Sequence, residues 1–132
     1  MINSEKITVA HEPVQHALIC TTKAKVITFE DFKAAFNEIG TLIPTLEIKK
    51  LVFDKRSLKF FDQPSMTWYH IHWKVDMLKL GLNSYRKILP NDPIFKQSVE
   101  IGKSKIKREN PQFDFSQFDI QYFDSVEESL KN

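Results

Sequence analysis

Short β-rich segments alternate along this chain with longer segments in which apolar residues recur at helical spacing. Residues 7–10 and 17–22 are rich in β-branched and apolar residues, which predicts two strands. Residues 11–13, His-Glu-Pro, predict a turn between them. The chain is therefore expected to begin with an antiparallel hairpin.

A first helix is predicted over residues 29–42, where apolar residues return every three or four positions. Thr28, followed three residues later by Asp31, resembles a capping box with Asp in place of the usual Glu or Gln. Gly40 and Pro44 mark the expected exit from this helix.

A third strand is predicted at residues 50–53, followed by a helix that starts near residues 64–66, runs to about Leu80 and is capped by Gly81. This helix carries apolar residues on two opposite sides. Its two stripes are Met66, Tyr69, Trp73, Met77 and Leu80, and Trp68, Ile71, Val75, Leu78 and Leu82. A helix that is apolar on two sides is buried on two sides, so the second stripe needs the protein's own elements, a second copy, a partner or a ligand against it.

The remaining elements follow the same alternation. Residues 83–89 predict a strand, and Asp92-Pro93 begins a helix that ends before Asn110-Pro111. Residues 118–123 predict a half-buried strand, and Ser125 caps a last short helix. The order β-β-α-β-α-β-α-β-α predicts one α/β domain over residues 1–132, with a mixed sheet of about five strands covered by about four helices.

The amino-acid composition argues against several classes of protein. Hydrophobic residues make up 42% and charged residues 27% of the 132 positions, which argues against disorder. A net charge of +2 gives no reason to expect nucleic-acid binding. The polar N-terminus and the absence of a long apolar run lead us to expect neither a signal peptide nor a membrane protein. The single Cys20 fits a reducing cytoplasm and is expected to be a small core residue.

The order and several local patterns resemble a STAS domain, closest to the stand-alone SpoIIAA-like branch of small bacterial proteins. The segments that carry the resemblance are LVFDKRSLKFFDQPSM (residues 51–66) with the helix after it, RKILPND (86–92) and YFDSVEESL (122–130). The resemblance implies the STAS fold, a non-catalytic role in protein–protein regulation, and a partner such as an anti-sigma-type kinase or another signalling protein.

The loop that carries the phosphorylated residue in regulatory STAS domains reads Asp62, Gln63, Pro64, Ser65 in this chain. Asp62 matches the family pattern. The phosphorylatable position falls on Pro64, which has no hydroxyl, and Ser65 stands where the family has glycine. The resemblance therefore implies an interaction module that is controlled by its amount or by ligand occupancy.

Residues 62–65 are also open to two interpretations from the residues alone. Asp62, Gln63 and Ser65 form either a binding corner at a helix N-terminus or an ordinary helix cap. Arg86, at the end of the next strand, is expected at the same edge of the sheet and is a candidate to share a polar pocket with them.

Other groups favour structural explanations. His70 and His72 are two positions apart, so on a helix they cannot form the i, i+4 pair of a zinc site. Lys103, Lys105 and Lys107 are expected to complement the negative end of a helix and to remain solvated. No metal, cofactor or catalytic residue is predicted.

The sequence therefore predicts a non-catalytic cytoplasmic interaction module, with a homodimer as a further possibility. The alternative is a domain that binds or senses a small ligand such as a lipid or nucleotide beneath a movable helix. The predicted interaction residues are Asp62, Gln63, Ser65, Trp68, Ile71, His72 and Arg86.

Overall fold

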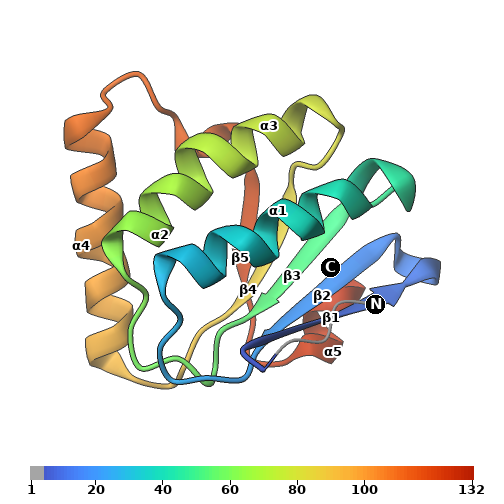
Figure 1. Ribbon diagram of the computed structural model, residues 1–132, viewed down its shortest axis with the longest axis horizontal. Helices are drawn as coiled ribbons and strands as arrows, with labels where there is room; N and C mark the ends of the chain where they lie inside the picture. The colour runs from blue at the N-terminus through green and yellow to red at the C-terminus, as the bar shows by residue number, and fades with distance from the viewer. Residues whose placement is uncertain (1–4) are drawn as a thin grey trace.

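A five-stranded sheet forms the centre of the computed structural model, which describes residues 5–132 (Figure 1). The strands lie side by side in chain order, the first pair antiparallel and the other three pairs parallel. They are β1 (Ile7–Glu12), β2 (Ala17–Thr22), β3 (Lys50–Asp54), β4 (Ser84–Ile88) and β5 (Asp119–Tyr122). The predicted hairpin and the predicted mixed sheet are confirmed.

Helices cover both faces of this sheet. They are α1 (Phe29–Thr45), α2 (Gln63–Trp68), the π-helical turn η2 (Tyr69–Trp73), α3 (Lys74–Lys79), α4 (Pro93–Glu109) and α5 (Val126–Lys131), with short 3₁₀ turns η1 (Pro13–Gln15) and η3 (Phe115–Gln117). α2, η2 and α3 follow one another without a break and form a single rod, so the order along the chain is the predicted one. The α/β class is confirmed.

The long helices share one face of the sheet and α5 lies on the other (Figure 1). Each helix in a β–α–β connection joins one parallel strand to the next, and these connections have the same handedness. When every connection leads to the next strand in the same direction along the sheet, the helices all lie on one face. α5 contacts β3 and β4 from behind. β3 and β4 are consequently covered on both faces, and all their residues except the first of each, Lys50 and Ser84, are buried.

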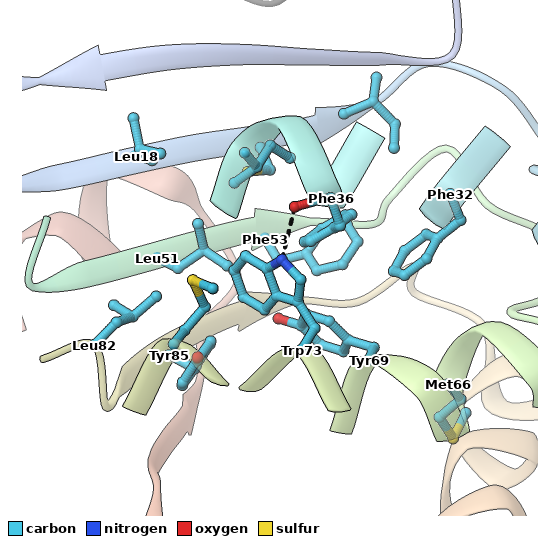
Figure 2. Packing of buried hydrophobic residues seen from close by; sticks show 14 of the residues in the cluster. Leu18, Phe32, Phe36, Leu51, Phe53, Met66, Tyr69, Trp73, Leu82 and Tyr85 are labelled. Atoms are coloured by element: carbon cyan, nitrogen blue, oxygen red, sulfur yellow. Dashed lines mark hydrogen bonds between the residues drawn. The ribbon is translucent and has the colours of Figure 1, made fainter. Parts of the chain in front are cut away.

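Aromatic rings fill the space between the sheet and the rod of α2 and α3 (Figure 2). Tyr69 meets the ring of Phe36 edge-on at 5.2 Å and that of Phe53 at 5.7 Å between centroids. The Trp73 indole Nε1 donates a hydrogen bond of 2.7 Å to the backbone oxygen of Phe36 and so joins this rod to α1. Each such ring buries enough apolar surface to contribute about 2 kcal/mol to folding.

Local helix-start signals have the predicted geometry. The Thr28 hydroxyl accepts the amide hydrogen of Asp31, the Asp92 carboxylate accepts that of Ile94, and the Ser125 hydroxyl accepts that of Glu128. Cys20 is fully buried in β2, as expected for a core residue.

Two local predictions are wrong. Gly40 does not end the first helix, which continues to Thr45 with Pro44 in its last turn. A Cβ on Gly40 would lie 3.3 Å from Nε1 of Trp73, so the glycine allows the two helices to approach closely. His11 belongs to β1 rather than to a turn, because the strand continues past it and it pairs with Leu18.

Candidate functional site

The predicted corner at Asp62 is a helix cap. One Asp62 carboxylate oxygen accepts the Ser65 amide hydrogen at 3.0 Å, and the buried Ser65 hydroxyl donates to the same carboxylate at 2.7 Å. The hydrogen-bonding groups of Asp62 and Ser65 are therefore paired with each other, as in an ordinary helix cap, which was one of the two interpretations of this segment. An anion placed at this helix start would face the negative charge of Asp62.

Gln63, Trp68 and His72 lie close together along the outer side of the same helical rod. The Gln63 amide donates to the Thr67 hydroxyl at 3.1 Å and to the Gly102 backbone oxygen at 3.3 Å, which ties α2 to α4. Trp68 is half-buried, with its ring edge-on to Phe32, and His72 is exposed. Trp68 and His72 line two shallow hollows, one against α1 and one that also includes Gln63.

Ile71 is half-buried, and a hollow beside it is lined by the irregular segment of residues 110–113. The neighbouring His70 meets the ring of Phe115 from the same part of the chain at 5.0 Å. The protein's own chain therefore covers part of the second apolar stripe.

Arg86 does not join the Asp62 corner. Its guanidinium donates to the Asp119 carboxylate and to the terminal Asn132 backbone oxygen, both at 2.9 Å. Lys50 donates to the backbone oxygen of Leu130 at 3.1 Å. Both cations lie on the α5 face of the sheet, where they satisfy carbonyl groups at the C-terminal end of that helix.

The helical rod is buried over one broad face rather than along two separate stripes. His70 and Lys74, which belong to neither apolar stripe, are as buried as Tyr69 and Trp73, whereas Leu80 is exposed. The π-helical turn at residues 69–73 rotates less per residue than an α-helix does, so the residues after it are shifted around the helix axis. A wheel drawn at 3.6 residues per turn does not reveal this broad face.

Three lysine side chains gather beneath this face at the carboxyl ends of β3 and β4. Lys74 has no exposed surface, and Lys55 and Lys87 are each 2% exposed. Lys55 directly follows β3, Lys87 lies in β4, and Lys74 comes from α3. Lysine is almost never fully buried without a partner, so three together form the least expected feature of the fold.

Aromatic rings surround these amines. The Lys74 Nζ lies 4.3 Å from the ring centre of Tyr85, 5.0 Å from that of Tyr69 and 5.2 Å from that of Phe118. The Lys55 Nζ lies within 4.8 Å of the ring centres of Phe53 and Phe61. The Lys87 Nζ lies 5.5 Å from the ring centre of Tyr69. Ring faces attract cations by about 1–2 kcal/mol each, less than the cost of burying an ammonium group.

Several polar atoms around the amines have no partner. Within residues 5–132 no carboxylate forms an ion pair with Lys55, Lys74 or Lys87. The Lys74 Nζ, the Tyr69 and Tyr85 hydroxyl oxygens and the His70 Nδ1 are buried without a hydrogen bond to any described residue. Buried polar groups are normally paired, so an unpaired set that converges on one place indicates a binding site.

Burial and nearby lysine charges lower the pKa values of all three amines. Burial, reinforced by the charge of Lys103, lowers the pKa of Lys87 to about 7. Burial and then the charges of Lys87 and neighbouring lysines lower the pKa values of Lys55 and Lys74 well below the usual lysine range. The same two causes lower the pKa of His70, which leaves its imidazole neutral at neutral pH. Burial raises the pKa values of Tyr69 and Tyr85, so both hydroxyl groups keep their protons.

Lys103 and Tyr122 form the outer border of the cluster. The half-exposed Tyr122 is the register partner of Lys87, and its hydroxyl lies 2.7 Å from the Lys103 Nζ. Tyr122 also lines a pocket of about 390 Å³ between α4 and the end of β5, together with Leu89, Lys96, Glu100, Phe123, Asp124 and Glu128. The expectation of a fully solvated lysine group on α4 is therefore wrong for Lys103, which contacts Tyr122.

The three buried lysines were missed by reasoning from helix caps and loop motifs. The available signal was the strand Ser84–Ile88, which reads Ser-Tyr-Arg-Lys-Ile. A strand in the middle of a parallel sheet is covered on both faces, so its two adjacent cations must both be buried. That pattern locates Lys87, but the approach of Lys55 and Lys74 depends on the fold.

Comparison of the chain with family models, curated proteins and solved structures found no match. The part of the chain that the structure describes contains no group of three or more His, Cys, Asp or Glu side chains placed to hold a metal ion. None of its helices is long and apolar enough to cross a bilayer.

Proposed function

We propose that this protein binds a small molecule with a phosphate or carboxylate group, and that Lys55, Lys74 and Lys87 hold the anionic group. The observation that carries the proposal is the burial of three lysine amines with no carboxylate paired to them among residues 5–132. The proposal develops the small-ligand alternative of the sequence analysis.

The three buried lysines lower the stability of the fold. Bringing an unpaired ammonium group into a protein interior costs several kcal/mol, even after its pKa falls and the amine becomes neutral. Methionine or leucine at the same positions would fill similar space without that cost. Proteins keep such costly groups where they serve binding or catalysis.

The surrounding groups suit an anion. Three ammonium groups can balance the charge of a phosphate, while the Tyr69 and Tyr85 hydroxyl groups remain free to donate to its oxygens. Tyr122, the register partner of Lys87, also lines a pocket of about 390 Å³, a size typical of small-molecule sites.

Binding of an anion is expected to take up protons. About half of the Lys87 amines are neutral near pH 7 because of the lowered pKa. A bound anion favours the charged form, so the pKa values of these amines rise and protons are taken from the buffer. Affinity for the anion should therefore decrease as the pH rises above about 7.

The test is a titration of the full chain with inorganic phosphate, followed by amide chemical shifts at constant ionic strength. We expect saturable shifts that converge on residues 55, 74 and 87, and their loss in Lys74→Met. Lys107→Met, which removes an exposed charge from α4, should bind phosphate like the original chain. Shifts that follow the exposed α4 lysines in place of the buried ones would contradict the proposal.

A second candidate function is the protein contact that the STAS resemblance implies. The observation in its favour is that Gln63, Trp68 and His72, chosen from the sequence as interaction residues, line adjoining hollows on one side of the molecule. Partner identity and a homodimer remain proposals. If the chain dimerises through this side, Trp68→Asp should lower the mass measured by light scattering from that of a dimer to that of a monomer. A monomeric mass for the original chain would contradict the dimer.

A further inference from the structure

We propose that residues 111–118 form a lid over the three buried lysines and that the ring of Phe115 holds this lid closed. The inference rests on the proposed anion site, because a ligand needs a route to it. The lysine amines are buried and line none of the surface hollows described above. A ligand can therefore reach them only after a covering element moves aside.

The other elements around the lysines are firmly held. The strands on one side of the cluster are joined by the parallel ladder of β3 and β4. The helical rod is tied to α1 by the hydrogen bond of the Trp73 indole and to α4 by that of the Gln63 amide. Movement of the rod or of the sheet would break these bonds, so the segment that joins α4 to β5 is the remaining candidate.

The lid lies against the lysine cluster through two aromatic rings. The ring centre of Phe118, at its end, lies 5.2 Å from the Lys74 Nζ. The ring of Phe115 meets the imidazole of His70 edge-on at 5.0 Å, and the Lys103 Nζ lies 5.9 Å from its centre. His70 is itself beside the buried amines, since burial and then their charges lower its pKa. Phe115 thus spans from the rod to α4 next to the cluster.

The hydrogen bonds of the lid are all local. Within residues 5–132 its groups bond only to one another and to Asn110, and no ion pair includes it. The chain is fixed at both ends, because the Asn110 amide donates to the Ile106 oxygen and the Asp119 amide to the Asn83 oxygen, both at 2.8 Å. Such a segment can open without breaking a helix or the sheet.

The first half of the lid stands apart from the rod. A hollow of about 470 Å³ lies between Ile71 on the rod and residues 110–113. The described ring contacts of Phe113 are with Phe115 at 4.9 Å and Phe118 at 6.1 Å, both within the lid. The middle of the lid therefore meets the rod at Phe115, and loss of this ring should favour the open state.

The experiment measures how fast a neutral disulfide reagent, dithiodipyridine, reaches a thiol placed at the site. Lys74→Cys puts this thiol on the rod behind Phe118, and the native Cys20, buried in β2, is the internal reference for opening of the whole fold. Peptide mass spectrometry separates the two thiols. We expect the introduced thiol to react about tenfold or more faster than Cys20, because local opening costs less free energy than unfolding. Equal rates would overturn the lid.

Phe115→Ala tests the closing contact in the same molecule. It should raise the rate of the introduced thiol, relative to that of Cys20, about threefold or more, because the open state becomes more populated. Phe60→Ala, which removes an exposed ring outside the lid, is the matched control and should leave this ratio unchanged. An unchanged ratio in Phe115→Ala would contradict the role of its ring.

The original lysines connect the lid with the anion site. In Phe115→Ala, phosphate exchange measured from amide line shapes should quicken about threefold while the Kd stays within about twofold, because a lid limits rates. Unchanged exchange would contradict the lid. A lid that opens locally in a chain without phosphate binding would reject the anion site alone. Phosphate binding by the original chain, with equal thiol rates in Lys74→Cys, would reject the lid and leave the anion site standing.

Discussion

Lys87 is the residue at which binding and stability oppose each other most clearly. Its amine lies in the sheet with almost no exposed surface, and burial lowers its pKa to about 7. In the unfolded chain the same amine has the ordinary lysine pKa of about 10.4. The difference links the stability of the fold to pH.

The direction of that linkage follows from proton counting. Below pH 7 both states hold the proton, and the full cost of a buried charge weakens the fold. Between pH 7 and about 10 the unfolded chain holds a proton that folded Lys87 has released, so a higher pH favours the folded state. We expect Lys87 alone to raise the free energy of unfolding by about 3 kcal/mol from pH 7 to about 9.5, as measured by urea denaturation, and Lys55 and Lys74 to add to this rise because their pKa values are also lowered.

The control for this pH effect is Lys107→Met, which should keep the rise because Lys107 is exposed. Lys87→Met should remove the contribution of Lys87 and leave those of Lys55 and Lys74. The range stops below pH 10 because the raised pKa values of Tyr69 and Tyr85 favour unfolding at higher pH. A free energy of unfolding that stays constant or falls from pH 7 to about 9.5 would mean that these lysines are not buried.

Single-residue signals in the sequence predicted local structure well and the site poorly. Thr28, Asp92 and Ser125 cap helices because a cap depends on neighbours within three positions. Lys55 and Lys74 stand nineteen positions apart, and only the pairing of β3 with β4 and the packing of α3 bring them near Lys87. The functional prediction from the sequence relied on the polar loop residues 62–65, whereas the unpaired lysines lie beneath the helical rod.

At the scale of elements, the start of α2 is fixed by Asp62. Asp62→Ala removes the acceptor for the Ser65 amide and leaves the buried Ser65 hydroxyl without its partner. We expect a loss of about 1–2 kcal/mol in the free energy of unfolding, measured by urea denaturation. Asp62→Asn keeps an acceptor and should retain most of the stability. Equal losses in the two variants would show that capping is not the role of Asp62.

The contact between α2 and α4 depends on Gly102. A Cβ at this position would lie 2.6 Å from the Met66 sulfur and 3.0 Å from the Gln63 amide oxygen, so the helices would have to separate. Gly102→Ala should lower the free energy of unfolding by about 1–2 kcal/mol, because overpacking exceeds the gain of about 1 kcal/mol in helix propensity. Ser104→Ala, at an exposed position of α4, is the matched control and should change little. A more stable Gly102→Ala would mean that the packing here is looser.

Helix existence and order followed from periodicity, but the buried face of the long rod did not. On a helical wheel of 3.6 residues per turn, His70 and Lys74 lie between the two apolar stripes. The π-helical turn at residues 69–73 widens the buried face and includes both residues. The predicted helix exit at Gly40 was wrong for a related reason. This glycine allows close contact with Trp73, but in the sequence it cannot be distinguished from a glycine that ends a helix.

At the scale of the whole molecule, two opposite faces of one sheet serve different purposes. Behind the sheet, Lys50 and Arg86 are paired with carbonyl groups and Asp119, and they hold α5 in place. In front, Lys55, Lys74 and Lys87 have no such partners among residues 5–132. Alternation along β4 alone decides that Arg86 is structural while Lys87 belongs to the proposed site.

The most direct measurement compares the free energy of unfolding at pH 7 with and without inorganic phosphate, for the original chain and for Lys87→Met. A ligand that binds only the folded state raises this free energy. The account predicts that Lys87→Met is more stable than the original chain without phosphate and gains little when phosphate is added, whereas the original chain gains. A less stable Lys87→Met that gains as much from phosphate as the original chain would contradict it.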